Sequence, residues 1–263
     1  MQPQTARTDK DGDRRDACPT EETSLSGIGV AILAGGLGTR LRSVVADRSK
    51  VIAEVNGRPF LSYILDHLAA AGFAEAVLCT GYGGAGLEKS LGDNHSGLRL
   101  RYSHETEPRG TAGALRLALP QIEAGDWLVL NGDSFCDADL PAFCRFHRQS
   151  GAKASLVLTH TDDPGSFGLV EVLPTKEIAA FREKVPGAAP GWVNAGIYLI
   201  SRPLLAQLPE GRSISLERDC FPTWVGHGLF GYQSGGRFLD IGTPESYGQA
   251  AAFFADRTGL VSA

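Results

Sequence analysis

The sequence predicts an α/β fold: a three-layer, Rossmann-like sheet that is mixed but mostly parallel, with helices on both faces. Two observations support this prediction. Up to about residue 160, short apolar runs alternate with amphipathic stretches, which is typical of strand–helix repetition around a mainly parallel sheet. After residue 160, apolar runs are joined by loops rich in Pro and Gly, which predicts a more antiparallel, α+β arrangement.

The first half of the chain supplies the strand and helix patterns in alternation. Apolar runs predict strands at residues 28–33, 76–79, 98–102, 127–130 and 154–159. Helical periodicity or helix-end signals predict helices at residues 60–71, 87–91 (the end of a short helix), 111–119 and 140–149. Pro120 stops the third of these helices, because proline cannot continue a helical hydrogen-bond ladder.

The second half predicts strands at residues 168–173, 178–182 and 196–200. A last helix begins after Thr243, with Thr243 as N-cap, Pro244 at the first helical position and Glu245 in the first turn. The sequence contains no internal repeat and no low-complexity linker. It therefore predicts a polar, disordered tail over residues 1–26 and one domain over 27–263, divided into 27–160, 161–243 and a C-terminal helix over 244–263.

Bulk properties exclude several classes of function. The chain has 263 residues and a formal net charge of −5, which argues against broad nucleic-acid binding. No apolar run approaches the roughly 20 residues that span a bilayer, so we expect no membrane partner. The five cysteines form no C-x-x-C pair, which is typical of free thiols in a reducing compartment and predicts a cytoplasmic protein.

The segment AGGLGTR, directly after the first strand, predicts a phosphate-binding turn. Gly35, Gly36 and Gly38 leave backbone N–H groups bare, and Arg40 adds a permanent forked positive charge. The Rossmann pattern G-x-G-x-x-G fails at Leu41, and no Lys-Ser or Lys-Thr follows to complete a P-loop. The alternative is a strand–helix corner in which glycine merely permits close packing.

Three charged residues outside this turn are candidates for the same site. Lys50 follows the glycine turn closely enough to fold back over its phosphates, although a loop lysine is usually a solvated charge. Asp133 ends the apolar strand before it, and Asp240 precedes the capped last helix. Two carboxylates converging from distant strands are what Mg²⁺-bridged phosphate chemistry requires. The alternative for Asp133 is an ordinary turn-forming residue.

Weaker candidates lie in three other segments. Gly110 and Thr111 open a helix with small residues, which would let a flat base approach the backbone, or would simply start a helix. Glu183, Lys184 and Asn194 could bind sugar hydroxyls and phosphate, or could be ordinary residues on a strand surface.

In their order along residues 28 to about 250, these motifs resemble those of the sugar-1-phosphate nucleotidyltransferases. The segments are GGLGTRL with a downstream lysine, NGD, FREKV, VNAGIYLI and DIGTPESY. GTRLRSVV, the EPRGTAGAL loop and the compact length are most similar to the heptose 1-phosphate guanylyltransferase branch. The family's Pro-Lys-Pro and Glu-Lys-Pro stand here as Ser49-Lys50-Val51 and Glu183-Lys184-Val185, which keep the charged groups.

The resemblance implies a nucleotide-diphospho-sugar transferase fold, with a nucleotide-binding half (27–160) and a sugar-binding half (161–243). It assigns catalysis to Arg40, Lys50 and Asp133; the nucleotide to Leu33, Ala34, Gly35, Gly36, Gly38, Thr39, Glu105, Gly110 and Thr111; the sugar phosphate to Gly168, Glu183, Lys184 and Asn194; and Mg²⁺ to Asp133 and Asp240. The implied substrates are GTP and a heptose 1-phosphate, the implied cofactor is Mg²⁺, and homo-oligomers are common in the family.

The expected reaction joins a sugar 1-phosphate to an NTP and releases pyrophosphate. Alternatives are a hexose such as mannose or glucose with another NTP, a nucleotide-sugar-dependent glycosyltransferase, or a non-catalytic nucleotide-sugar sensor. A glycosyltransferase would use a D-x-D pair, and Asp137 and Asp139 have that spacing. We expect them instead to cap the helix that starts at Leu140.

Overall fold

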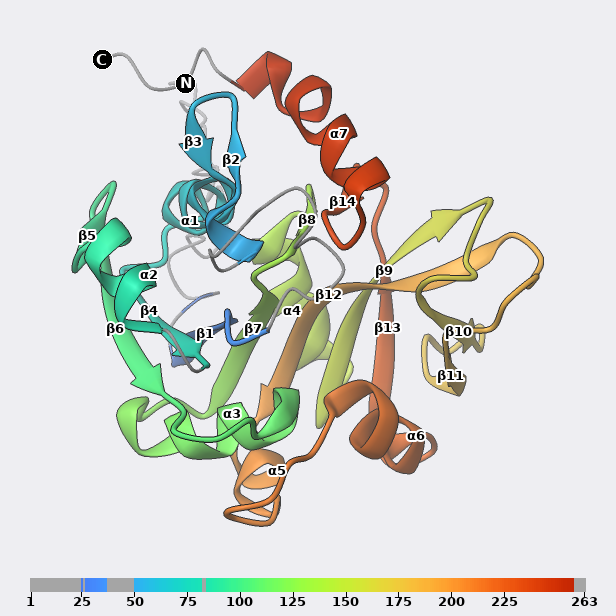
Figure 1. Ribbon diagram of the computed structural model, residues 1–263. Coiled ribbons are helices and arrows are strands. Elements are labelled where there is room, and N and C mark those ends of the chain that lie inside the picture. Colours follow the sequence, from blue (N-terminus) through green and yellow to red (C-terminus); the bar gives the residue numbers. More distant parts are fainter. Residues whose placement is uncertain (1–24, 26, 37–49, 82–83, 258–263) are drawn as a thin grey trace, which may run out of the picture.

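The computed structural model describes residue 25 and residues 27–36, 50–81 and 84–257 (Figure 1). Its strands are β1 (Ile28–Leu33), β2 (Glu54–Val55), β3 (Arg58–Pro59), β4 (Glu75–Thr80), β5 (Asn94–His95), β6 (Leu98–His104), β7 (Asp126–Asn131), β8 (Ser134–Cys136), β9 (Ala154–Thr161), β10 (Gly168–Val172), β11 (Ile178–Glu183), β12 (Gly191–Ser201), β13 (Leu229–Gln233) and β14 (Phe238–Asp240).

Helices connect most of these strands. The α-helices are α1 (Phe60–Ala70), α2 (Gly84–Leu91), α3 (Gly110–Ala118), α4 (Leu140–Gln149), α5 (Arg202–Ala206), α6 (Phe221–Trp224) and α7 (Pro244–Phe253). Short 3-10 helices are η2 (Lys50–Ile52), η3 (Leu119–Gln121) and η5 (Ala255–Arg257), and η4 (Leu216–Cys220) is a π-helix. No helix among the described residues has both the length and the apolar character needed to cross a membrane.

Ten of the described strands build one mixed sheet, which confirms the predicted fold class, whereas β8 with β14 and β2 with β3 form two separate two-stranded ribbons. The main path of the mixed sheet runs β11-β10-β12-β7-β1-β4-β6-β5. Outside this path, β9 pairs with β12, and β13 pairs with β9. Strands β7, β1, β4 and β6 are mutually parallel, as expected for the first half. Strand β12 is antiparallel to β7, β9 and β10, and β10 is antiparallel to β11. Most strands after residue 160 therefore pair in the antiparallel direction, as predicted, and β13 is an exception because it pairs in parallel with β9.

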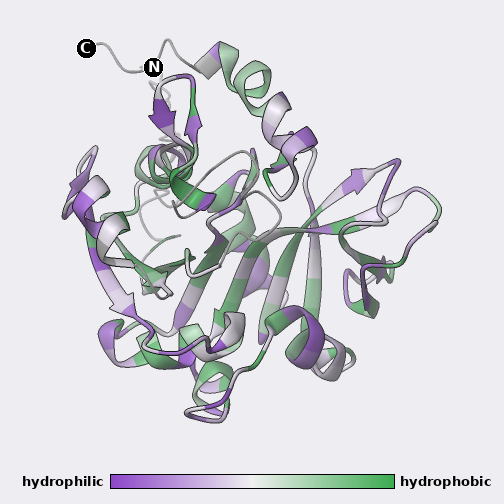
Figure 2. Cartoon of the chain, in the orientation of Figure 1, coloured by the Kyte–Doolittle hydropathy of each residue, from purple (hydrophilic) through white to green (hydrophobic). Residues whose placement is uncertain are grey.

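Helices cover both faces of the sheet, because successive strand residues point to opposite sides. On β1, Val30 and Ile32 join a core that contains residues of α1, α4 and the segment around α7. Ala31, between them, joins the opposite core with residues of α3, α5 and α6. Figure 1 shows these two groups of helices on either side of the sheet, and Figure 2 shows hydrophobic residues gathered along the central strands.

Most element boundaries agree with the sequence prediction, with three corrections. The last helix, α7, ends at Phe253 and is followed by η5, so it is shorter than the predicted 244–263, and residues 258–263 lie outside the described part. Strand β12 begins at Gly191 rather than residue 196, because its first residues pair with β9. Strand β10 ends at Val172, and Leu173 beyond it is exposed.

Candidate active site

The predicted site lies at one edge of the parallel part of the sheet. Strands β1, β4, β6 and β7 run in the same direction, so the segments that follow them meet at their carboxyl ends. Ligands of open α/β sheets bind at this edge. Gly35 follows β1, Glu105 follows β6 and Asp133 follows β7, so three predicted site segments share one end of the molecule.

The described part of the glycine turn is tightly packed on one side and open on the other. A Cβ on Gly35 would lie 2.8 Å from the Gly81 backbone nitrogen, so the turns after β1 and β4 approach each other closely only with glycine. Gly36 is exposed, and no atom of the described residues lies within 4 Å of the position that a Cβ would take. The packing alternative thus explains Gly35, whereas Gly36 leaves its backbone accessible. Gly38, Thr39 and Arg40 lie outside the described residues.

Lys50, Asp133 and Asp240 come together although they are far apart in sequence. The Lys50 Nζ donates to Asp133 Oδ2 at 2.8 Å, and the lysine side chain is only 12% exposed. The backbone of Asp133 accepts a hydrogen bond from Ile241 N at 3.0 Å, and the antiparallel pair β8–β14 places Asp240 opposite Ser134. The predicted convergence of the two carboxylates and Lys50 is therefore present in the structure.

The two carboxylates interact electrostatically. Burial, followed by the negative charge of Asp133, raises the pKa of Asp240 to about 6, while Lys50 and Lys184 lower it. A pair of acidic groups held this close favours a bound cation, and oxygen ligands of this kind suit Mg²⁺. The described residues contain no group of three or more Asp, Glu, His or Cys side chains placed so that they could hold a metal ion by themselves. Two carboxylates that share Mg²⁺ with substrate phosphates need no such cluster.

The sugar-side candidates lie along the β10–β11 hairpin and reach the same site. Gly168 pairs with Glu183 across the hairpin, and the Lys184 Nζ lies 3.6 Å from Glu183 Oε1. Burial is the main cause that raises the pKa of Glu183. The charge of Lys184, which follows β11, also lowers the pKa of Asp240, so the end of this hairpin lies within electrostatic range of the acidic pair.

The nucleotide-side candidates Gly110 and Thr111 begin α3 and are packed against residues 212–216. A Cβ on Gly110 would collide with the Ile214 carbonyl, so packing explains this glycine. The Thr111 hydroxyl accepts from Leu216 N at 2.7 Å and donates to Glu217 Oε2 at 3.0 Å. Burial is also the largest cause that raises the pKa of Glu105. Nucleotide contacts by these residues stay a prediction.

Asn194 is buried, and both of its polar side-chain atoms bond within the protein. Its Oδ1 accepts from Gly196 N at 2.9 Å, and its Nδ2 donates to the Tyr198 hydroxyl at 2.9 Å. Tyr198 belongs to the quoted VNAGIYLI motif, although only Asn194 of that motif received a predicted role, and its hydroxyl donates to Glu217, which lies outside the motifs. The only sequence signal for Glu217 is its place two residues after Ser215, the N-cap of η4.

Asp137 and Asp139, the D-x-D pair of the glycosyltransferase alternative, have structural partners in the fold. Asp139 accepts from Ala142 N at 2.8 Å and is the N-cap of α4, as expected. Asp137 lies near Arg237, and their charged atoms are 3.9 Å apart. The pair thus has structural partners at the start of α4.

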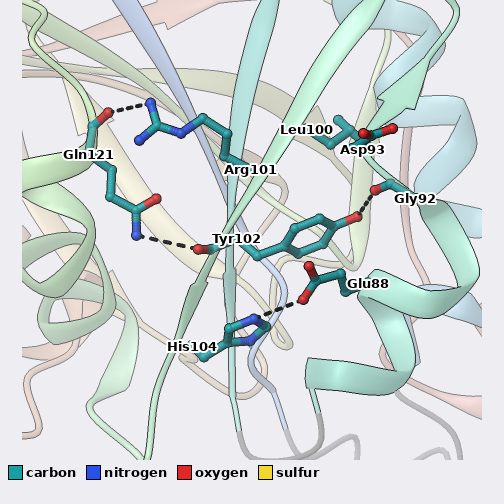
Figure 3. Close-up of a pocket in the computed structure, with 8 residues that line it drawn as sticks. All are labelled: Glu88, Gly92, Asp93, Leu100, Arg101, Tyr102, His104 and Gln121. Carbon is teal, nitrogen blue, oxygen red and sulfur yellow. Dashed lines mark hydrogen bonds and ion pairs between the residues drawn. The ribbon is translucent and has the colours of Figure 1, made fainter.

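A surface cavity of about 540 Å³ lies beside β6 and α2 (Figure 3). In Figure 3, Tyr102 and His104 project from β6 toward Glu88, and the His104 Nε2 lies 3.0 Å from Glu88 Oε2. His104 also contacts Thr80 Oγ1 at the end of β4, at 2.8 Å. Asp133 and Asp240 are not among the residues that line this cavity, so it borders the acidic pair's end of the sheet without containing it.

The fold is that of an α/β protein with acidic and basic side chains gathered beyond the carboxyl ends of its parallel strands. A match to the nucleotidyl transferase family extends over residues 29–257, and the chain belongs to this family. It is 34% identical over 229 residues to a mannose-1-phosphate guanylyltransferase from Mycobacterium tuberculosis, covering 86% of this chain and 64% of that protein. A mannose-1-phosphate guanylyltransferase catalytic subunit beta from Drosophila pseudoobscura pseudoobscura is 33% identical, covering 88% and 63%. The chain thus spans less than two thirds of these relatives' length.

Solved structures agree with this fold. HddC from Yersinia pseudotuberculosis superposes with a TM-score of 0.77 and 31% identity, covering 86% of this chain and 99% of that one. The same protein has been solved in complex with GMP-PN. A putative glucose-1-phosphate thymidylyltransferase from Bacillus anthracis superposes equally well, at 0.77, but at 22% identity it supports the fold alone.

Proposed function

We propose that this protein is a sugar-1-phosphate guanylyltransferase, which transfers GMP from GTP to a sugar 1-phosphate and releases pyrophosphate. The observation that carries the proposal is the meeting of Lys50, Asp133 and Asp240 at the carboxyl edge of the sheet, beside the turn after β1. Guanine as the base is supported by the guanylyltransferase relatives and by the GMP-PN complex of HddC.

The chemistry needs few special groups. An oxygen of the sugar phosphate forms a bond to the α-phosphorus of GTP, and the bond from that phosphorus to the pyrophosphate oxygen breaks. Because the attacking phosphate is already ionised at neutral pH, no general base is required. The protein's task is to hold the two substrates in line and to neutralise charge on the phosphates.

Asp133 and Asp240 would hold Mg²⁺, whose charge would stabilise the α-phosphate and the leaving pyrophosphate. Lys50 keeps Asp133 oriented through its 2.8 Å contact and brings positive charge to the phosphate end of the site. On the sugar side, Glu183 would accept hydrogen bonds from hydroxyls and Lys184 would pair with the sugar phosphate. Gly168 pairs with Glu183 and lets the Phe181 ring and the Glu183 carboxylate pack closely against the backbone, because a Cβ there would collide with Phe181. The Asn194 side chain accepts a hydrogen bond from Gly196 N and so holds the neighbouring part of β12.

The sugar is proposed to be a heptose, with mannose as the second candidate. The sequence resemblance to the heptose branch supports the first, and the two mannose-1-phosphate guanylyltransferase relatives support the second. A glycosyltransferase is less well supported, because Asp139 caps α4.

A pyrophosphate-release assay tests the proposal. The purified chain is incubated with MgCl₂, each of five NTPs, and either heptose 1-phosphate, mannose 1-phosphate or glucose 1-phosphate. We expect the highest kcat/KM with GTP and heptose 1-phosphate. In a separate incubation with NDP-sugars, release of a nucleoside diphosphate would instead indicate a glycosyltransferase. Binding of GTP by calorimetry without turnover of any sugar phosphate would indicate a sensor.

A further inference from the structure

A hydrogen-bond network beneath the proposed site converges on the carboxylate of Glu217. Its Oε2 accepts from the Thr111 hydroxyl at 3.0 Å and from the Ser215 hydroxyl at 2.9 Å. Its Oε1 accepts from the Tyr198 hydroxyl at 3.3 Å. One carboxylate therefore receives hydroxyl groups from α3, from the N-cap of η4 and from β12, three segments that are distant in sequence.

The Tyr198 arm connects this carboxylate to the strand that precedes Asp133. The phenol is fully buried, and burial raises its pKa well above the ordinary value, so it is a neutral donor. Besides donating to Glu217, it accepts from Asn194 Nδ2 at 2.9 Å and from Asn131 Nδ2 at 3.3 Å. Asn131 is the last residue of β7, two residues before Asp133.

The Thr111 arm fixes the start of α3. The Thr111 hydroxyl accepts from Leu216 N at 2.7 Å, so it is held on both sides by residues 216 and 217. Ala112 N adds a hydrogen bond to the Ile214 carbonyl at 2.9 Å. The helix start that the family resemblance assigns to the nucleotide is thereby attached to the segment that carries Glu217.

We propose that Glu217 is a positioning residue for guanylyl transfer: it holds the nucleotide-side helix α3 in a fixed place relative to β12 and the end of β7. The inference rests on the proposed function. The Thr111 arm leads to the side proposed for the nucleotide. The Tyr198 arm leads through Asn194 to the proposed sugar side and through Asn131 to the strand that precedes Asp133. Since in-line transfer depends on the relative placement of two substrates, loosening this junction acts on the reacting geometry more than on either binding step.

Glu217→Gln is the most direct test, because it keeps the shape of the side chain. An amide has one acceptor oxygen and an NH₂ donor, so it cannot accept all three hydroxyl groups. We expect kcat to fall about 10–100-fold, the scale of a misplacement of order 1 Å, with both KM values within about threefold. Glu210→Gln is the matched control: it removes the same charge from a side chain that is 75% exposed, and it also removes an ion pair to Arg116 of α3, so it controls for the loss of one charged contact to that helix.

Two further variants separate positioning from simple structural support. Thr111→Val removes the hydroxyl group that donates to Glu217 and should lower kcat, whereas Thr111→Ser keeps a hydroxyl group and should retain the wild-type kcat. Tyr198→Phe opens the other arm, and because both arms end on one carboxylate, the Thr111→Val and Tyr198→Phe losses in kcat should be less than additive. A direct nucleotide contact by Thr111 would instead appear as a raised KM for GTP.

Kinetics are measured with GTP and whichever of heptose 1-phosphate and mannose 1-phosphate the wild type turns over, after melting curves establish that each variant is folded. If the wild type is active and the kcat of Glu217→Gln equals that of Glu210→Gln, this inference is wrong, whereas the proposed function still stands. Additive losses for the two arms also overturn this inference. A wild type that turns over no sugar 1-phosphate refutes the proposed function, and this inference with it.

Discussion

Asp133→Asn separates the chemical role of the acidic pair from its structural role. In the folded protein the Lys50 Nζ donates to Asp133 Oδ2 at 2.8 Å, with the lysine side chain 12% and the aspartate side chain 39% exposed. Asparagine keeps the size of the side chain and one acceptor oxygen, but it removes the negative charge. It therefore removes the ion pair with Lys50 and the repulsion that Asp133 exerts on Asp240.

The two effects on stability oppose each other. A partly exposed ion pair contributes up to about 1 kcal/mol, and relief of repulsion at Asp240 offsets part of its loss. We therefore expect the free energy of unfolding to change by less than about 1 kcal/mol. Loss of one preorganised electrostatic group in a site costs turnover on the order of 10²–10³-fold, or about 2.7–4 kcal/mol of activation free energy. Activity should fall far more than stability.

The assay is pyrophosphate release with GTP and heptose or mannose 1-phosphate across a titration of MgCl₂, together with thermal unfolding. Asp139→Asn is the matched control, because asparagine is as good an N-cap as aspartate and α4 should keep its start. The control should retain wild-type turnover. Near-normal, Mg²⁺-dependent turnover by Asp133→Asn would refute the metal role of this residue.

Three further changes test other parts of the argument. Lys50→Gln should lower turnover by on the order of 10²-fold, and an unchanged kcat/KM for GTP would show that Lys50 only supports Asp133. Asp139→Ala should lower the free energy of unfolding by about 1 kcal/mol at unchanged turnover, and a loss of activity in the folded variant would revive the D-x-D alternative. Gly196→Ala should destabilise the protein by about 1–3 kcal/mol in denaturant unfolding, because its φ is +75° and a Cβ would collide with Ser134 Oγ. Wild-type stability would show that the irregular part of β12 around Gly196 can relax.

The elements that the sequence predicted well carry their signals locally. The apolar run of β1 and the helical periodicity of α1 each lie within a dozen residues. Thr243 at the start of α7 forms the expected cap, with its hydroxyl accepting from Ser246 N. Such features depend on neighbouring residues, so no knowledge of the tertiary fold is needed to find them.

The elements that the sequence did not predict are short or depend on distant partners. Strands β8 and β14 have three residues each, too few to show a period of two. Strand β13 forms by pairing with β9, whose residues lie 75 positions earlier in the chain (Leu229 opposite Ala154). The Glu217 junction joins residues separated by 106 and 19 positions. No local pattern encodes such a contact.

Part of the candidate site could be predicted from the sequence, because the topology of a parallel sheet determines which segments lie close together. Segments that follow parallel strands meet at one edge, so Gly35 and Asp133 could be placed together from the strand pattern alone. The packing reasons for Gly35 and Gly110 could not be predicted, since they depend on the backbones of Gly81 and Ile214. Roles for Gly38, Thr39 and Arg40 stay predictions.

The short ribbon of β8 and β14 explains how Asp240 reaches Asp133 (Figure 1). Phe135 and Leu239 are opposite each other and buried, at 2% and 5% exposure, and Phe135 packs on Phe254 with ring centroids 5.1 Å apart. Because side chains alternate along a strand, the next pair, Ser134 and Asp240, points to the other face. A slip of one residue would turn the carboxylate into the apolar core and the leucine out of it. The apolar pair therefore fixes the register that turns Asp240 away from the core and toward the phosphate end of the site.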